Sequence, residues 1–303
     1  MRTSRLPGGW KHRILSLAIM FVWLLQAAPQ GFCAGDIDAV VKAGKLRHLG
    51  IPYANFVKRD NTGLDVELMQ AFSEYLGVAY ELVITDWEHI ISDLTGSVVT
   101  PSGEDVVVEG DAPVRGDVIA AGFTVLPWRE KVMDFSEPTF PSGVWLIARS
   151  EAPITPISPA GNIEKDIMAV KRRMKGISVL TLKDSCLAPE LYGLKETGAD
   201  IRMFPLDKDL DEMIPSVVAR MAEATLSDVP VALIGLSTWA GKVKVIGPVS
   251  EPQEMAAGFR KESPKLRRAF AEFFRAFKAS GRYRMLVSKY YPSVFIYYPS
   301  FFD

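Results

Sequence analysis

The feature that most constrains the fold of this chain is the alternation of short apolar runs with segments of helical periodicity. The runs at 46–51 and 80–84 have the length and spacing of strands, and each precedes a segment whose apolar residues share one helical face. This alternation predicts a parallel sheet with crossover helices, and hence an α/β fold. Ligands of such sheets bind beyond the carboxyl ends of the strands, which directs attention to the loops after Ile51, Ile84 and Thr124.

The same alternation recurs in the second half of the chain, beyond a stiff segment with three prolines at 151–159. We therefore predict two lobes, each a mostly parallel sheet flanked by helices, with residues 35–150 and 248–303 in the first and 151–247 in the second. Two interlobe crossings are expected, within 150–159 and 245–249. In the second lobe we predict helices at 163–174, after Ser185 and at 210–222, and strands at 177–182, 201–204, 224–226 and 243–247.

Four segments of the first lobe have distinctive patterns. The nearly continuous apolar run 117–124 predicts a central strand buried on both faces, and 144–148 predicts another strand. Residues 96–116 carry valine runs on both sides of a Pro-Ser-Gly turn, which predicts an inserted β-hairpin. A long amphipathic helix is expected at 264–279, and its buried side is formed by Leu266, Phe270, Phe273, Phe274 and Phe277.

The N-terminal segment differs in character from the rest of the chain. Four basic residues precede an apolar run of 15 residues at 14–28, and small residues follow at 31–35. This order is typical of a secretory leader, and the run is shorter than the roughly 20 residues that span a bilayer as a helix. We predict a signal peptide at 1–34 and a periplasmic mature protein. The alternatives are an uncleaved anchor and a lipid anchor at Cys33, although Phe32 stands where lipoprotein signals usually carry a small residue.

Charge and cysteine content limit the partners of the mature chain. Removal of the leader takes four of the 35 basic residues and none of the 36 acidic ones, which leaves a formal charge of −5. This acidic balance gives no electrostatic basis for nucleic-acid binding. If Cys33 leaves with the leader, Cys186 is the single remaining thiol, so an internal disulfide cannot form. We expect a monomer that is stabilised by packing.

The most specific motif of the sequence lies at 121–138. In it, Gly122 and Thr124 end an apolar strand, Arg129 follows five residues later, and a Phe-Ser-x-Pro turn comes next. The motif resembles the signature of the family 3 extracellular solute-binding proteins, the periplasmic receptors of polar amino acid ABC importers. Four further blocks match the family and occur in the order in which the family has them. They lie at 63–68, 226–233, 257–259 and 281–283, so the resemblance covers about residues 40 to 295.

The resemblance implies a two-lobed fold of the periplasmic-binding-protein type II, with two interlobe crossings. Proteins of this family close a cleft around a small solute and deliver it to an inner-membrane permease. The implied function is therefore binding of an amino acid or small carboxylate, with no cofactor, no metal and no catalytic residue.

A free amino acid carries a carboxylate and an ammonium, and burying either charge without a partner is costly, so its cleft needs a fixed cation and a fixed anion. Arg129 suits the carboxylate, because a guanidinium can form two parallel hydrogen bonds with it, and the family arginine does so. The resemblance further implies that Asp228 holds the ammonium from the opposite lobe, and that Gly122 and Thr124 supply a carbonyl and a hydroxyl.

Structural alternatives remain open for each of these four positions. Arg129 could be a solvated side chain after a strand, and Gly122 and Thr124 could reflect ordinary strand-end geometry. Asp228 could be the N-cap of the helix that begins near Pro230, since Asp before Val-Pro is a common helix start.

Three other positions are candidate ligand contacts. Ser185 lies in the turn 183–186, where the family has a glycine- and serine-rich turn whose helix N-terminus helps to bind the carboxylate. Trp87 and Tyr53 follow the second and first strands, where family members often stack an aromatic ring on the ligand. Packing in the core is the alternative role for both rings.

The sequence departs from the family pattern at two places. Asp184 and Cys186 replace small residues of the ligand turn, and a carboxylate at 184 would repel an anion. Ile51 and Pro52 stand where polar amino acid receptors commonly carry an acidic or polar residue. The expected solute is therefore an amino-acid-like zwitterion or a different small carboxylate, which the protein delivers to an ABC permease or reports to a membrane sensor.

Enzymatic function is the other class of hypothesis. Nucleophile-elbow, dinucleotide-binding and phosphate-loop motifs are missing, and His48 and His89 lack partners at metal-ligand spacing. Lytic transglycosylases carry such a domain ahead of a catalytic one, for which we expect no room after 264–279. Cyclohexadienyl dehydratases reuse the binding cleft with an added acid, for which Asp184 is the one unexpected carboxylate. We expect a binding protein and not an enzyme.

Overall fold

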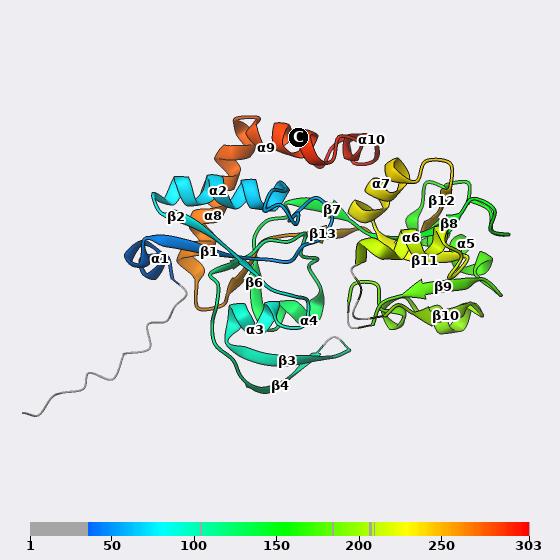
Figure 1. Cartoon of the computed structure of the whole chain (residues 1–303), viewed down its shortest axis with the longest axis horizontal. Helices are drawn as coiled ribbons and strands as arrows, with labels where there is room; N and C mark the ends of the chain where they lie inside the picture. Colours follow the sequence, from blue (N-terminus) through cyan, green and yellow to red (C-terminus); the bar gives the residue numbers. More distant parts are fainter. Residues whose placement is uncertain (1–35, 104, 184, 206–207, 209, 303) are drawn as a thin grey trace, which may run out of the picture. The chain divides into compact units, whose positions relative to one another are not determined.

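A computed structural model describes residues 36–103, 105–183, 185–205, 208 and 210–302 (Figure 1). The predicted leader, with Cys33, lies outside the described residues, as does Asp184. Among the residues that are described, no helix combines the length and the apolarity that a membrane span requires.

The first lobe is built on a five-stranded sheet with the strand order β2-β1-β5-β14-β6. Its strands are β1 (Lys45–Gly50), β2 (Ala79–Ile84), β5 (Val118–Ile119), β6 (Met133–Phe135) and β14 (Gly258–Arg260). Strands β2, β1 and β5 are parallel, whereas β14 runs antiparallel to both of its neighbours. The helices of this lobe are α1 (Ile37–Ala43), α2 (Leu64–Leu76), α3 (Ile90–Thr95), α4 (Pro127–Glu130), α8 (Pro264–Ala279), α9 (Arg282–Tyr290) and α10 (Val294–Tyr297).

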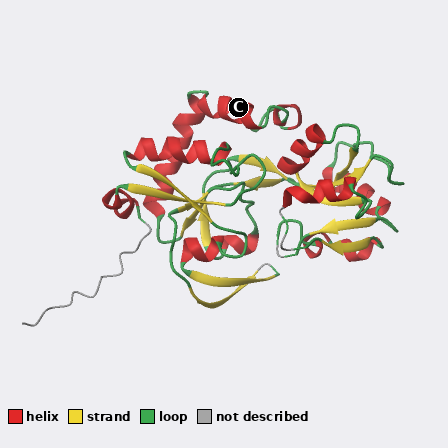
Figure 2. Ribbon diagram, viewed as in Figure 1, coloured by secondary structure: helices red, strands yellow, loops and turns green. Residues whose placement is uncertain are grey.

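Helices cover both faces of this sheet (Figure 1, Figure 2). Val118 and Ile119 of β5 point to opposite faces, because side chains alternate along a strand. Val118 belongs to the apolar cluster that contains the buried sides of α2 and α8, and Ile119 to the cluster of α3 and α4. Helix α8 has the predicted bounds, and its five predicted core side chains are all buried.

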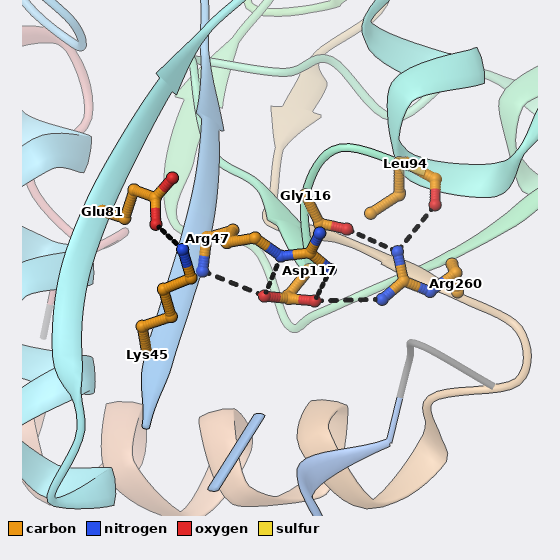
Figure 3. Close-up of polar contacts among 7 residues, drawn as sticks. All are labelled: Lys45, Arg47, Glu81, Leu94, Gly116, Asp117 and Arg260. Carbon is orange, nitrogen blue, oxygen red and sulfur yellow. Dashed lines mark hydrogen bonds and ion pairs between the residues drawn. The ribbon is translucent and has the colours of Figure 1, made fainter. Parts of the chain in front are cut away.

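The predicted insertion is a β-hairpin of β3 (Ser97–Ser102) and β4 (Asp105–Asp111). Its two ends are held together on the first sheet (Figure 3). Arg260 Nη1 donates to the carbonyl of Leu94, just before the hairpin, at 2.7 Å, and to the carbonyl of Gly116, just after it, at 2.5 Å. Arg260 also pairs with Asp117 at 3.3 Å, and Arg47 Nη2 donates to the same carboxylate at 2.7 Å. This buried cluster fixes where the hairpin leaves and rejoins the lobe.

The second lobe is built on a sheet with the order β10-β9-β11-β8-β12. Its strands are β8 (Val144–Arg149), β9 (Ser178–Thr181), β10 (Asp200–Met203), β11 (Ala224–Asp228) and β12 (Val243–Pro248), and its α-helices are α5 (Ile163–Arg173), α6 (Met213–Val218) and α7 (Val229–Thr238). Short 3-10 helices occur at η1 (Pro189–Tyr192), η2 (Leu194–Thr197) and η3 (Leu210–Glu212). Strand β8 is antiparallel to β11 and β12, so this sheet, like the first, is mixed.

The position of β8 corrects the predicted first crossing between the lobes. The segment 144–148 was expected in the first lobe, with a crossing at the prolines of 151–159, but β8 pairs with β11 and β12 of the second sheet. The proline segment lies along that sheet, since Ile157 N donates to the carbonyl of Ile246 at 2.9 Å. The proline-rich segment 151–159 has the composition of a linker, which is why the crossing was predicted there. Its pairing with β12, far along the sequence, cannot be recognised from a local sequence pattern.

Both crossings lie side by side in a short ribbon. Strand β7 (Phe140–Ser142) leads from the first sheet into the second, and β13 (Gln253–Met255) leads back. The two strands pair antiparallel, with Ser142 opposite Gln253. The second crossing therefore also lies beyond its predicted position at 245–249.

Two local predictions differ from the structure. The whole segment 117–124 is packed in the interior, but only β5 within it is a strand, because Gly122 adopts a left-handed φ of 59° and turns the chain. After Ser185 the chain forms the four-residue η1 and not an α-helix, since Pro189 and Gly193 bracket that segment. Among the described residues, the helix that follows Ser185 is therefore only four residues long.

Candidate ligand-binding site

A cavity of about 670 Å³ lies at the predicted edge of the first sheet. The loops after β1, β2 and β5 all contribute to its wall, as expected for the carboxyl ends of parallel strands. The second lobe closes the other side. The wall contains Pro52, Tyr53, Thr85, Asp86, Trp87, Glu88, Phe123, Trp128 and Arg129 from the first lobe, and Leu182, Lys183, Ser185, Lys208, Leu210 and Asp211 from the second.

Arg129 brings a buried positive charge to this cavity. Its side chain is 4% exposed, and its Nη1 donates to the carbonyl of Thr124 at 2.8 Å. Its Nε makes no hydrogen bond, and within the described part of the chain no carboxylate pairs with the guanidinium. The guanidinium lies 3.9 Å from the centre of the Phe123 ring. Burial lowers the pKa of Arg129 to about 10, so the side chain is charged at neutral pH and lacks an anion.

Asp228 is buried but lies behind Tyr53. It accepts a hydrogen bond from the N–H of Val231 at 3.2 Å, which makes it the N-cap of α7, the structural role that the sequence left open. Its other oxygen accepts from the Tyr53 hydroxyl, across the boundary between the lobes. Burial raises the pKa of Asp228 to about 7. Asp228 borders a small pocket with Leu187 and Met213, so Tyr53 connects it to the cavity that contains Arg129.

Gly122 and Thr124 shape the loop that carries Arg129. The N–H of Gly122 donates to Asp65 at 2.7 Å, and a Cβ at this position would lie 2.3 Å from the Phe56 ring. Only glycine fits both that contact and the positive φ. Thr124 is buried, forms a bridge with Met255, and offers its carbonyl to Arg129. In this structure both residues position the guanidinium.

Aromatic rings of the first lobe form part of the cavity wall, and two of them, Phe123 and Trp128, lie against the Arg129 guanidinium. Tyr53 and Trp87, both predicted, meet edge to face with ring centres 5.4 Å apart. Trp87 stacks on Phe123 at 6.3 Å, and Trp128 also lines the cavity. Trp87 is 37% exposed, so it belongs to the cavity surface and not to the core.

The turn of the second lobe contributes Ser185 and the neighbouring Cys186. Ser185 lines the cavity, but its hydroxyl already donates to the carbonyl of Leu182 and accepts from the N–H of Leu187. Cys186 is a buried free thiol that interacts electrostatically with Arg129. Burial raises the pKa of this thiol.

Several cavity residues were not predicted as site residues. Phe123 and Trp128 lie within the motif at 121–138, and Asp86 and Glu88 flank Trp87. Their closeness in sequence to predicted site residues could have identified all four. Other unpredicted residues come from the second lobe without a motif of their own, namely Lys208, Leu210 and Asp211.

Over the described ranges, three or more His, Cys, Asp or Glu side chains do not gather in a metal-binding group. His48 is buried in the first lobe, and its partners are Tyr80 and the carbonyl of Ala120.

Solved structures share this fold. A mutant of ArgBP from T. maritima superposes with a TM-score of 0.65 at 20% identity, covering 84% of this chain and 99% of that one. An ancestral amino acid-binding protein, described as a precursor of cyclohexadienyl dehydratase, has a TM-score of 0.62 at 24% identity, with coverages of 84% and 98%. At these identities the likeness supports the two-lobed type II fold.

Sequence comparison adds a curated relative and a family. The relative, membrane-bound lytic murein transglycosylase F of Desulfosudis oleivorans, is 26% identical over 239 residues, which are 78% of this chain and 46% of the relative. The chain thus spans about half the length of that relative. The model of the bacterial extracellular solute-binding proteins, family 3, matches residues 112–293, well over half of the sequence. With the motif around Arg129 and the two-lobed fold, this match shows that the chain belongs to the bacterial extracellular solute-binding proteins, family 3.

Proposed function

We propose that the protein binds a small carboxylate-bearing solute of the amino acid class in the cavity at Arg129, in the periplasm, and delivers it to an ABC importer. The observation that carries this proposal is the buried Arg129 guanidinium, which has no carboxylate partner in the described chain and a free Nε. A buried charge without a counter-ion is costly, and a ligand carboxylate would supply the missing charge through paired hydrogen bonds.

The rest of the cavity suits the body of such a solute. Its volume of about 670 Å³ accommodates a small molecule, and the rings of Tyr53, Trp87 and Phe123 offer apolar faces. The rim carries Asp86 and Glu88, which suit a positively charged group. The solved neighbours support the class, since their descriptions include an arginine-bound ancestral protein and a glutamate complex.

A solute ammonium would engage Asp228 only after Tyr53 moves or shares its hydrogen bond. The Tyr53 hydroxyl occupies one carboxylate oxygen, and the N–H of Val231 occupies the other. We therefore place the carboxylate of the solute at Arg129 first, and treat its ammonium contact as the weaker part of the recognition.

The test is a thermal-shift screen of the mature protein against amino acids, small carboxylates and amines, followed by calorimetry on each hit. A ligand that binds only the folded state raises the melting temperature. We expect hits to carry a carboxylate, and Arg129→Gln to weaken their binding at least about 100-fold, the factor for a lost buried charge-assisted contact.

Lys131→Gln is the matched control for this experiment. It removes an exposed cation two residues away, which pairs with Asp105 at 3.6 Å, and should leave binding unchanged. Unchanged binding in Arg129→Gln, or hits that are all amines without a carboxylate, would refute the proposed site.

We propose a binding protein and not an enzyme. Incubation with prephenate or arogenate measures the dehydratase alternative, and turnover of either would contradict this assignment. A membrane sensor is the alternative recipient of the solute, and a permease and an ATPase encoded beside the gene would favour import.

A further inference from the structure

The residues expected to hold the α-ammonium of an amino acid do not face the cavity that contains Arg129. The described residues that line this cavity include neither Gly122 nor Thr124 nor Asp228. Asp228 is 2% exposed, and both of its oxygens already accept hydrogen bonds, one from Tyr53 and one from the first turn of α7. An α-ammonium beside Arg129 therefore meets no carboxylate at the predicted position.

Carboxylates border the cavity at other places. Asp86 and Glu88 line it from the first lobe, and Asp211 lines it from the second. Asp86 is fixed by its own turn, because it accepts from the N–H of Glu88 at 3.0 Å and from the N–H of His89 at 2.9 Å. Asp211 accepts from the N–H of Ala54, across the boundary between the lobes, at 3.3 Å. Negative charge is thus held in the wall by both lobes.

Aromatic rings connect these acidic groups to the buried cation. The Arg129 guanidinium lies 3.9 Å from the centre of the Phe123 ring, and Phe123 stacks on Trp87 with ring centres 6.3 Å apart. Asp86 and Glu88 flank Trp87 in the sequence. The cation and the two carboxylates therefore border one cavity at the two ends of a row of rings.

The acidic end of this row favours a cation as its occupant. The Trp87 side chain is 37% exposed, and the face of an aromatic ring attracts positive charge. Lys183 and Lys208 also line the cavity from the second lobe, but Lys208 pairs with Glu212 at 3.4 Å. A negative group next to Trp87 would meet the ring face and two carboxylates on the same side.

We propose that the cavity selects solutes with a carboxylate at one end and an amine or guanidinium at the other, and that an α-ammonium is not required. The chemical class is the ω-amino and ω-guanidino carboxylates. The distant cation lies at Trp87, between the charges of Asp86 and Glu88. This inference rests on the proposed function in placing the carboxylate of the solute at Arg129.

The experiment removes one charged group at a time from arginine, which carries all three. δ-Guanidinovalerate lacks the α-ammonium, norvaline lacks the guanidinium, and agmatine lacks the carboxylate. Calorimetry with the mature protein measures the dissociation constant of each compound. We expect δ-guanidinovalerate to bind within about fivefold of arginine and more tightly than norvaline, because the loss of a buried charge partner would cost on the order of 100-fold. Agmatine should bind at least about 100-fold more weakly than δ-guanidinovalerate.

Shorter ω-guanidino carboxylates, each compared with the α-amino carboxylate of the same chain length, extend the test to other sizes of solute. Tighter binding of the α-amino compound at every length would overturn the inference. Tighter binding of glutarate or adipate than of any of these cationic compounds would also overturn it, since a dicarboxylate would direct its second charge to Lys183 and Lys208.

Variants locate the two cationic contacts. Trp87→Leu and Glu88→Gln should each weaken δ-guanidinovalerate at least about threefold more than valerate, which keeps the carboxylate and lacks the cation. Glu74→Gln is the control, because it removes an exposed carboxylate of α2 that lines a different pocket, and it should leave both affinities unchanged. Equal losses for the two ligands in both cavity variants would contradict the assigned position of the cation.

Asp228→Asn tests the dispensable α-ammonium directly. It should change the affinities for arginine and δ-guanidinovalerate by the same factor, and a larger loss for arginine would show that Asp228 holds the α-ammonium. The ligand comparison uses the unaltered chain, so it decides even if a variant does not fold. If Arg129→Gln binds every probe as the parent does, the proposed function fails. If binding depends on Arg129 but norvaline is preferred, only this inference fails.

Discussion

At the scale of single residues, several ionisable side chains are buried without an ion-pair partner in the described chain. Burial lowers the pKa of Arg129 to about 10 and raises the pKa of Asp65 and Asp228 to about 7. Asp65 has a local role, because it accepts the N–H of Gly122. Arg129 likewise makes one local hydrogen bond, to the carbonyl of Thr124, but its charge has no carboxylate partner in the described chain, and a ligand carboxylate can offset the cost of burying that charge.

The cost of the Arg129 charge leads to a stability prediction. Arg129→Met keeps most of the apolar stem and removes the unpaired charge. We expect the free energy of unfolding of the unliganded variant to rise by about 1–3 kcal/mol, while carboxylate binding is lost. Urea unfolding and calorimetry on the same preparation check both halves, and a destabilised variant would show that the guanidinium is structural.

The two roles of Asp228 can be separated by a pair of variants. Asn is as good an N-cap as Asp, so Asp228→Asn should preserve α7, whereas Asp228→Ala should be about 1 kcal/mol less stable than Asp228→Asn. Both variants remove the carboxylate that would hold an ammonium. Equal stability of the two variants in thermal unfolding would contradict the capping role.

The buried His48 ring should contribute less to stability in acid. Its ring is buried and neutral, with Nε2 donating to the carbonyl of Ala120 and Nδ1 accepting from Tyr80, and burial lowers its pKa to about 4. Below about pH 6.5 the unfolded chain takes up a proton that the folded chain refuses until about pH 4. The contribution of His48 to stability should therefore fall by about 3 kcal/mol across that window.

His48→Gln tests this effect, because glutamine has a donor and an acceptor but no titration. Urea unfolding at a series of pH values should show that the stability of the variant rises relative to that of the parent as pH falls from about 6.5 to 4. Asp65 and Asp228 have raised pKa values, so their contribution to stability acts in the opposite direction and is lost as pH rises from about 4 to 7. Both residues are present in variant and parent, so their effect cancels in the comparison. Parallel curves for variant and parent would exclude His48 as the cause.

Where one motif or strand end concentrated the signal, the sequence picked out residues that the structure brings to one cavity. The segment 121–138 located Arg129, and the strand ends located Tyr53 and Trp87, all of which line the cavity. The hydrogen bond between Tyr53 and Asp228 joins residues 175 positions apart, so no local pattern could reveal it.

At the scale of elements, the contrast between the buried and exposed ion pairs of Figure 3 is instructive. Arg260 and Asp117 are about 5% exposed, and Arg260 also holds the carbonyls of Leu94 and Gly116 at the two ends of the hairpin. Lys45 and Glu81 form a pair on neighbouring strands with more than 40% exposure. Both pairs join separate segments of the chain, but only Arg260 of the first pair also holds the two ends of the hairpin.

Two variants convert this contrast into a prediction. Arg260→Met leaves two buried carbonyls without that donor, and should lower the free energy of unfolding by about 2–4 kcal/mol. Glu81→Gln, the control, should cost less than about 1 kcal/mol. Urea unfolding measures both, and limited proteolysis should cleave Arg260→Met first near the hairpin. Equal costs would mean that the cluster does not anchor the insertion.

Elements with their own periodicity were predictable, and elements defined by distant partners were not. Helix α8 carries its pattern within one stretch of sequence, and the structure gives it the predicted bounds. Strand β8 has a strand pattern, but its sheet is chosen by β11 and β12, about 80 to 100 residues away, so the boundary between lobes was misplaced.

At the scale of the whole molecule, contacts between the lobes flank the cavity. The Tyr53 hydroxyl donates to Asp228, and the N–H of Ala54 donates to Asp211 at 3.3 Å. Both contacts join the two lobes, so they favour a closed arrangement that a ligand would stabilise further.

Tyr53→Phe should shift this balance toward an open form. The variant keeps the ring that packs on Trp87 and loses only the hydroxyl. We expect a larger radius of gyration for the unliganded variant in small-angle X-ray scattering, and a return to the parent value with saturating solute. An unchanged radius would show that the hydroxyl does not control closure.

The paired crossings have a consequence for how such proteins can be recombined. The chain enters the second lobe at Val144 and leaves it at Val249, and the N–H of Val249 donates to the carbonyl of Val144 at 2.7 Å. Topologically the second lobe is an insertion in the first lobe, and its two ends lie next to each other. Two cuts, one after β7 and one before β13, would remove it as a unit. Grafting this lobe from a relative between β7 and β13 would exchange the second lobe's share of the cavity wall as one unit, and with it part of the selectivity for solute.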